Sequence, residues 1–326
     1  MRLKIGMLFF VIVGITLFVV TRSNNDFPAN AAGAAVTITV DTGESGSSIA
    51  AKLERAGVIK SGKFFISLAI RDARAKAIGP GVHTIERHIP AAVAITELLD
   101  QKRVVGLVIV KEGSTYSDVL ADLKGNSSVD CTAKLDKFTP YIPNKLNSLE
   151  GQIFPAQYSF TPKTTCSQAI KSMVQRFAQS AASIGLNTVA KPYEVLTIAS
   201  MVQIEGDPRD FGKVARTIYN RLKIGMPLQL NSTVQYAAHL RGRIAISTSA
   251  TQIHSPYNTY KYVGLPPTPI SNPSVAAISA TLNPDSGSWL YFITVKPGDT
   301  RFTNSYSEFS GWEVLYHKNL SAGAFK

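Results

Sequence analysis

Glu205 is the acidic side chain whose position most favours acid–base chemistry. It ends residues 193–205 (YEVLTIASMVQIE), a segment that is apolar on most faces and therefore predicts a central, buried helix. Glu205 follows Val202 by three residues and Ile198 by seven, so its side chain extends an apolar stripe. Burial and the negative end of the helix dipole both disfavour a carboxylate there. The pattern predicts a carboxyl group with a raised pKa.

A carboxylic acid that stays protonated near neutral pH can donate a proton to a leaving oxygen. The alternative is structural: a Glu at a helix end that reaches solvent, or that pairs with Arg209 or Arg221. Asp207 predicts a helix cap, because Pro208 follows it and Asp-Pro typically begins a helix. Two-carboxylate glycosidases hold their acidic pair on either side of the scissile bond. The sequence gives Glu205 no evident partner of that kind.

Other catalytic patterns are missing from the sequence. The five histidines are scattered and form no HExxH pair, so neither a metal site nor a cofactor is expected. There is no G-x-S-x-G elbow and no phosphate-cradling glycine loop. Cys131 and Cys166 lie in no CxxC motif, which argues against thiol catalysis. Whether they pair in an oxidising compartment or remain two separate core residues stays open.

The elements that must position Glu205 predict an α+β chain. A β-branched alternation predicts a strand at 36–40, with Ser47 or Ser48 capping the helix that follows, and 82–85 predicts a second strand. The continuous apolar run at 104–110 predicts a strand buried on both faces. Apolar residues at helical spacing predict helices over 49–56, 62–77, 90–102 and 192–205.

The N-terminus predicts a membrane anchor. Arg2 and Lys4 precede an apolar run at 5–20, which is slightly short for a spanning helix but long for a signal-peptide core. Basic residues before the run favour a cytoplasmic N-terminus. We therefore expect a stub at 1–4, an uncleaved single-pass anchor at 5–21 and a linker at 22–35. The rest of the chain would lie outside the inner (cytoplasmic) membrane, on its periplasmic side.

The charge balance indicates an anionic partner. The 34 Lys and Arg residues outnumber the 22 acidic residues, which gives a net charge of +12. Such a surface suits an acidic polymer or an anionic membrane, or it simply keeps the protein soluble. The basic residues are scattered and no RNA-binding aromatic motif or zinc-finger spacing occurs, so nucleic acid is not an expected partner.

Several sequence blocks follow Glu205 in a fixed order, and Glu205 itself ends the first of them. The blocks are 198–205 (IASMVQIE), 214–222 (VARTIYNRL), 225–234 (GMPLQLNSTV), 255–260 (SPYNTY) and 264–267 (GLPP). Together they resemble the endolytic murein transglycosylase (YceG-like) family of bacterial enzymes, and weaker resemblance extends back to 149–155 (LEGQIFP). The chain departs from the family pattern at Asn231 and Gln203, where acidic residues are frequent.

The resemblance implies a lytic, non-hydrolytic cleavage of the β-1,4 bond between N-acetylmuramic acid and N-acetylglucosamine in nascent peptidoglycan strands. The family's catalytic residue falls on Glu205. It would protonate the glycosidic oxygen and then deprotonate the muramyl C6 hydroxyl, which closes a 1,6-anhydro ring without a second protein carboxylate. Neutral side chains in the blocks are candidates for sugar binding, or alternatively fix loops: Asn220, Gln229, Asn231, Thr233, Tyr257 and Asn258.

The resemblance also implies the domain layout. A strand–helix–helix–strand module at 36–103 is similar to LysM-type glycan-binding modules, and a mixed α+β catalytic domain follows at 104–326, with core motifs at 192–310. Peptidoglycan synthases are partners at the level of the family. Two other interpretations remain: a non-catalytic glycan-binding scaffold, which the Asn231 departure favours, and a two-carboxylate hydrolase, which needs an acidic residue across the cleft.

Overall fold

The computed structural model describes residues 25–41, 43–240 and 250–325. The predicted anchor at 5–21 lies outside them. Within the described ranges, no helix is both long and apolar enough to cross a membrane. The chain forms two compact units: the first contains residues up to 109 with 126–130 and 157–164, and the second contains 110–125, 131–156 and 165–326.

The first unit is built on an antiparallel pair, β1 (Ala35–Val40) and β2 (Gly81–Glu86), in which Val36 pairs with Ile85. Both strands confirm the sequence predictions. Helices α2 (Gly46–Arg55), α3 (Gly62–Ala69) and α4 (Ala91–Leu99) pack against this pair around a buried apolar core. The short strands β3 (Leu107–Val110) and β5 (Ala156–Ser159) pair with each other, as do β4 (Val129–Asp130) and β6 (Thr164–Thr165).

Three local predictions in this region were wrong at the ends of elements. The cap of α2 is Ser45, whose hydroxyl accepts the Ser48 N–H at 3.2 Å, and not Ser47 or Ser48. The helix predicted over 62–77 ends at Ala69, because Asp72 caps a separate 3₁₀ turn, Ala73–Ala77. The helix predicted over 90–102 likewise ends at Leu99, and Gln101–Arg103 forms a 3₁₀ turn capped by Asp100.

The strand predicted over 104–110 is shorter and less buried than expected. Only Leu107–Val110 is a strand, and Ile109 is 38% exposed while Val108 and Val110 are buried. Gly106 ends the strand on its N-terminal side with a φ of +57°. A Cβ atom there would collide with the Phe160 carbonyl oxygen. Burial on both faces was therefore a wrong prediction, since the strand alternates like the edge of a half-buried sheet.

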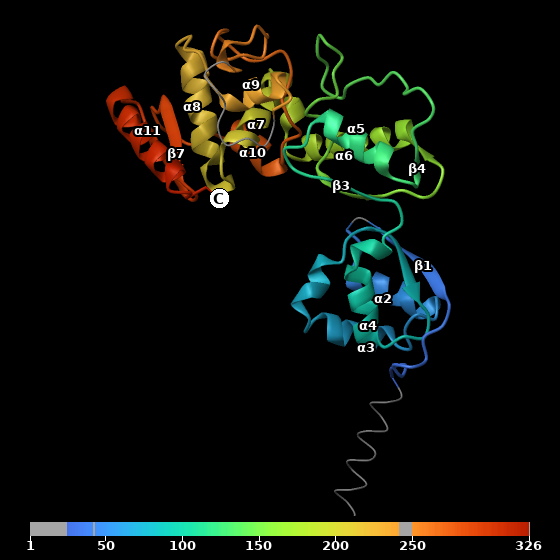
Figure 1. Ribbon diagram of the computed structural model, residues 1–326. Coiled ribbons are helices and arrows are strands. Elements are labelled where there is room, and N and C mark those ends of the chain that lie inside the picture. The colour runs from blue at the N-terminus through green and yellow to red at the C-terminus, as the bar shows by residue number, and fades with distance from the viewer. Residues whose placement is uncertain (1–24, 42, 241–249, 326) are drawn as a thin grey trace, which may run out of the picture. The chain divides into compact units, whose positions relative to one another are not determined.

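The second unit is centred on α7 (Pro192–Glu205), which contacts α8 (Phe211–Lys223), α9 (Asn231–Ala237) and α10 (Val275–Leu282). In Figure 1, the hairpin β7 (Tyr291–Lys296) and β8 (Asp299–Thr303) lies beyond α8, and α11 (Tyr306–Ser321) packs on that hairpin. The mixed α+β class is confirmed.

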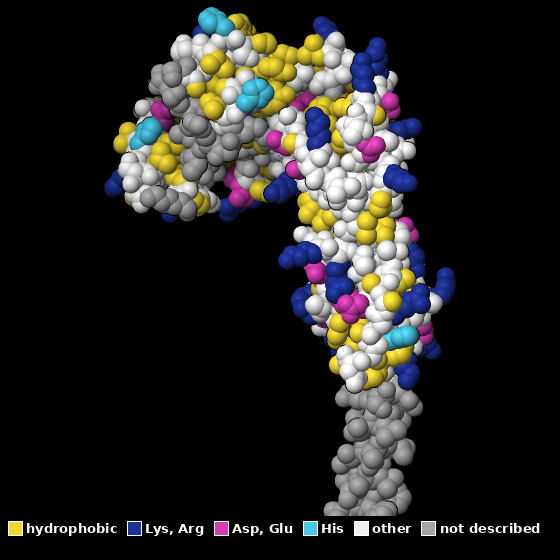
Figure 2. All heavy atoms as spheres, turned by 45° about the vertical axis from the view of Figure 1, so that its right-hand side comes forward, with side chains coloured by type: hydrophobic (Ala, Val, Ile, Leu, Met, Phe, Trp, Pro, Cys, Tyr) yellow, Lys and Arg dark blue, Asp and Glu magenta, His cyan; other side chains and the backbone are white. Residues whose placement is uncertain are grey.

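Helices α5 (Tyr116–Gly125) and α6 (Cys166–Ser183) complete the second unit. A disulfide joins Cys131 to Cys166 at the start of α6, which decides between the two alternatives left open by the sequence. Figure 2 shows Lys and Arg side chains distributed over the face in view, without one dominant basic patch.

Candidate active site

Glu205 is the last residue of helix α7 and lines a cavity in the second unit. Pro192 occupies its first turn, where a missing N–H costs little. The helix is buried from Leu196 to Val202 among the apolar residues of α8 and α10. It ends at Glu205 as predicted, because Gly206 leaves the helix in an extended conformation. Phe211 packs so closely on Gly206 that a Cβ atom there would lie 2.9 Å from its ring.

The start of α9 meets the Glu205 carboxyl group. The Ser232 N–H donates to Glu205 Oε1 at 3.1 Å, and this donor is one of the free N–H groups of a helix N-terminus. The Ser232 hydroxyl is buried and forms no well-formed hydrogen bond among the described residues, but it is near enough to Glu205 to favour its anion. The carboxyl group therefore receives one well-formed hydrogen bond and a nearby polar hydroxyl.

Opposing effects act on the pKa of Glu205. Burial raises this pKa above its usual value, and it outweighs the Ser232 contacts and the Arg221 charge, which favour the anion. The residue keeps partial solvent access through the cleft, while the carboxyl itself is closely surrounded by protein atoms. The direction agrees with the prediction from the helix pattern.

The ion pairs with Arg209 or Arg221 that the sequence allowed for Glu205 do not form. Arg209 pairs with Asp207 at 3.1 Å, and Asp207 accepts the Arg209 N–H as a helix cap. The Arg221 guanidinium donates to the carbonyl oxygens of Leu228 at 2.6 Å and Leu290 at 2.5 Å. Among the described residues, no basic side chain lies within ion-pair distance of Glu205.

Asn231 and Gln229 lie with Glu205 in the same cavity, which has a volume of about 650 Å³. Asn231 Oδ1 accepts a hydrogen bond from the Tyr260 hydroxyl at 2.6 Å. Burial and, next, the Glu205 charge raise the pKa of Tyr260 to about 12, so the phenol stays a donor. Gln229 adopts a φ of +49°, an uncommon backbone conformation for a residue with a side chain.

The structure does not bring Asn220 to this cavity. Its side-chain amide donates to the carbonyl oxygens of Gly287 at 3.1 Å and Trp289 at 2.9 Å. It lines a second, shallow cavity with Arg216 and Lys223 on another face of α8. Asn220 thus fastens the segment that leads into β7.

The other predicted sugar-binding residues also hold the loops around the cavity. Thr233 is fully buried and bonds the Leu230 carbonyl and the Thr259 hydroxyl. Asn258 is fully buried, and its amide donates to the carbonyls of Thr251 and Ile253. The Tyr257 hydroxyl shares a hydrogen bond with Thr268. These three residues shape the site without lining the cavity.

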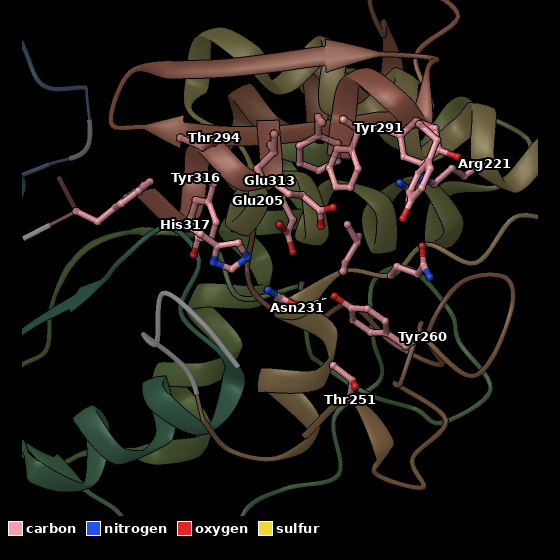
Figure 3. A pocket seen from close by; sticks show the side chains of 17 residues that line it. Glu205, Arg221, Asn231, Thr251, Tyr260, Tyr291, Thr294, Glu313, Tyr316 and His317 are labelled. Carbon is pink, nitrogen blue, oxygen red and sulfur yellow. Dashed lines mark hydrogen bonds between the residues drawn. The ribbon is translucent and has the colours of Figure 1, made fainter. Parts of the chain in front are cut away.

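Residues from the C-terminal hairpin and helix line the opposite side of the cavity, and sequence reasoning missed them. Figure 3 shows Glu313, Tyr316 and His317 near Glu205, with Asn231 and Tyr260 on another side of that carboxyl group. Glu313 is the second carboxylate among the described lining residues. The available signal was a helical spacing: positions 306, 309, 313 and 316 fall on one face.

The described residues contain no cluster of three or more His, Cys, Asp or Glu side chains able to hold a metal ion. The cavity offers a proton donor, an Arg–Tyr pair with Arg221 5.4 Å from the Tyr291 ring centroid, neutral amides and several aromatic rings. This set suits acid catalysis on an uncharged, hydroxyl-rich substrate.

Comparisons with known proteins agree on one family. A sequence model of the YceG-like family matches residues 38–312. An endolytic murein transglycosylase of Bacillus subtilis (strain 168) is 31% identical over 298 residues, which cover 84% of this chain and 82% of that protein. One of Streptococcus pneumoniae (strain R6) is 28% identical, and the match spans 57% of its length.

The solved structures point the same way. A YceG-like protein from Listeria monocytogenes superposes with a TM-score of 0.56 at 23% identity, over 85% of this chain and 98% of the other. That likeness shows a shared fold. Since the family match extends over most of the chain and the Bacillus relative exceeds 30% identity across it, the chain belongs to the YceG-like family.

Proposed function

We propose that this chain is an endolytic lytic transglycosylase that cleaves peptidoglycan glycan strands between N-acetylmuramic acid and N-acetylglucosamine. The observation that carries the proposal is Glu205, a carboxyl group with a raised pKa that lines a cavity in the second unit. The names of the relatives in Bacillus and Streptococcus support the same activity.

In the proposed reaction, Glu205 first donates its proton to the glycosidic oxygen, and the C1–O4 bond breaks. The Glu205 carboxylate then removes the proton of the C6 hydroxyl, and O6 forms a bond to C1. Atoms balance without water, because one proton leaves Glu205 and one returns. The Ser232 N–H stabilises the transient carboxylate at 3.1 Å, and burial favours its reprotonation.

Hydrolysis is the second candidate, because Glu313 lines the same cavity. A hydrolase would use this second carboxylate to activate water or to attack the sugar. The two reactions leave different ends: a 1,6-anhydromuramyl end for transglycosylation and a reducing end for hydrolysis.

Digestion of uncrosslinked glycan strands followed by mass spectrometry tests the proposal. We expect anhydromuramyl ends with the wild type and a loss of about 10²- to 10⁴-fold in rate with Glu205→Gln, the usual contribution of a general acid. Reducing ends that disappear with Glu313→Gln would instead establish a hydrolase. If neither the wild type nor a variant cleaves the strands but binding is retained, the protein is a glycan-binding scaffold.

The proposal includes the location and the layout of the chain. The anchor at 5–21 would hold the protein in the cytoplasmic membrane with its catalytic domain at 104–326 outside, and the module at 36–103 would be a LysM-like glycan-binding module. Peptidoglycan synthases would be its partners. Membrane fractionation of the full chain and of a variant lacking residues 1–24 tests the anchor: recovery of both in the soluble fraction would refute it.

A further inference from the structure

Helix α11 carries a stripe of aromatic and acidic residues that is not sealed in a core. Tyr306, Phe309, Glu313 and Tyr316 recur at intervals of three, four and three residues and therefore share one face of the helix. In most amphipathic helices such a face is buried. Here no residue of α11 is buried, and all four line the cavity that contains Glu205.

The rings of this stripe form a preassembled wall. Phe309 stacks on Tyr291 of β7 with centroids 5.3 Å apart, and Tyr306 lies 5.7 Å from Tyr291. Further along the helix, Tyr316 packs edge-on against Phe325 at 5.5 Å. Neighbouring rings restrict each other, so little side-chain entropy is lost when a ligand contacts them. Tyr306 nevertheless remains 63% exposed.

Glu313 lies between the two aromatic groups on the stripe. Within the described ranges it forms no ion pair, and it is only partly exposed. A carboxylate in this position accepts hydrogen bonds, and a cavity lined by aromatic rings with a few polar groups is typical of ligand sites.

Three of the polar side chains predicted to bind sugar do not line the cavity. The amides of Asn220 and Asn258 donate to backbone carbonyls, and the Tyr257 hydroxyl bonds Thr268. These three side chains therefore hold the surrounding loops, and the contacts to the strand must come from residues that line the cavity. The α11 face lines it and contributes aromatic rings to it.

We propose that this α11 face, formed by Tyr306, Phe309, Glu313 and Tyr316, is a glycan-binding subsite that holds the strand against Glu205. The apolar C–H faces of sugar rings stack on the aromatic rings, and Glu313 accepts hydrogen bonds from sugar hydroxyl or acetamido N–H groups. The proposal rests on the proposed function and adds the residues that bind the strand.

The length of the stripe fits several successive sugars of a strand. Tyr306 and Tyr316 are ten positions apart, which at the helical rise corresponds to about 15 Å along α11. A wall of this length contacts several successive sugars at once.

Binding of labelled, uncrosslinked glycan strands to the Glu205→Gln protein tests the subsite without cleavage. Tyr306→Ala and Tyr316→Ala should each weaken binding about three- to tenfold, as expected for the loss of one aromatic contact. Tyr306→Phe and Tyr316→Phe keep the rings and should stay within about twofold. Val314→Ala is the matched control, because Val314 is on the same helix, is 71% exposed and does not line the cavity.

Steady-state cleavage by the same variants in the active protein separates this proposal from the proposed function. KM should rise for the Tyr→Ala variants while kcat changes little. Unchanged affinity in both Tyr→Ala variants, or an equal loss with Val314→Ala, would overturn the subsite. Weakened binding without any cleavage by the wild type would uphold the subsite and refute the enzyme. If Tyr306→Ala does not fold, Tyr306→Leu replaces it, because leucine keeps the apolar bulk without the ring. Unchanged affinity in Tyr306→Leu would then count against the subsite.

Discussion

At the scale of single residues, Glu205 lies where two helix termini meet. It ends α7, whose negative dipole end disfavours a carboxylate, and it accepts a hydrogen bond from the first turn of α9, whose positive end favours one. Burial raises its pKa on balance. A general acid that later acts as a base needs both protonation states to be accessible, and these opposing contacts provide them.

The raised pKa of Glu205 predicts a cost in stability at neutral pH. Below its usual pKa of 4.5 the carboxyl is protonated in both states and the cost is absent. As the pH rises above that value, the unfolded chain ionises first, so unfolding releases a proton and the free energy of unfolding falls. Glu205→Gln should therefore be more stable than wild type at pH 7 and equal to it near pH 4.

Chemical denaturation of both proteins at the two pH values measures this difference. Glu194→Gln is a suitable control, because Glu194 is on the same helix in an exposed pair with Lys191. A wild type that is more stable than Glu205→Gln at pH 7 would contradict the predicted direction.

Ser232 should adjust the pKa of Glu205 without itself donating the proton. Its hydroxyl favours the Glu205 anion, whereas its N–H bond is a backbone contact that survives substitution. Ser232→Ala should raise the pKa of Glu205 further and shift the alkaline limb of the pH–rate profile to higher pH. The profile of kcat/KM against pH measures it, and Ser232→Thr should restore the wild-type limb. A change in rate with an unmoved profile would indicate a purely structural role.

At the scale of elements, glycines with closely packed neighbours mark where a strand and a helix stop. Gly106 lies before β3 with a positive φ and faces the Phe160 carbonyl, and Gly206 ends α7 beside Phe211. The hydrophobic pattern alone determines neither the start of β3 nor the end of α7. The run at 104–110 is apolar throughout, yet the chain leaves the strand at Gly106 because only glycine fits that approach.

Gly106→Ala should lower the free energy of unfolding by at least about 2 kcal/mol, since the left-handed conformation is unfavourable for alanine and its methyl group would collide with a backbone carbonyl. Gly125→Ala is the matched control, because a Cβ atom there has open space around it. Urea denaturation compares the two. Equal stability of both variants would show that the β3–β5 region adapts easily.

At the scale of the whole molecule, the net charge of +12 predicts a long-range attraction to an acidic polymer. Peptidoglycan carries peptide carboxylates along neutral sugars, so charge should concentrate the protein on the wall while the cavity recognises the sugars. Screening shortens the reach of this attraction from about 10 Å at ~0.1 M salt to about 3 Å at ~1 M.

Sedimentation of the Glu205→Gln protein with purified peptidoglycan should therefore show weaker binding as salt rises over this range. Peptidoglycan whose carboxyl groups have been amidated is the control and should lose most of the salt dependence. Binding that is equally tight at both salt concentrations would place the affinity in the sugar contacts alone.

The sequence could predict those parts of the site that depend on near neighbours in the chain. The spacing of Ile198, Val202 and Glu205 fixes the face of α7, and Asp207-Pro208 fixes the following turn. The sequence could also have predicted that Asn220 points away from the core, because the buried face of α8 contains Val214, Ala215 and Ile218.

By itself, the sequence determined that a single carboxyl group ends a buried helix, because helical periodicity is a local property of the chain. Only the tertiary structure decided what surrounds it. The Ser232 N–H reaches Glu205 from 27 residues away, and α11 contributes Glu313 and its aromatic rings from the far end of the chain. Such contacts depend on how α7, α9, β7 and α11 pack together, which no local pattern specifies. The sequence alone therefore predicted Glu205 as the acid, but it did not predict that the α11 face lines the same cavity.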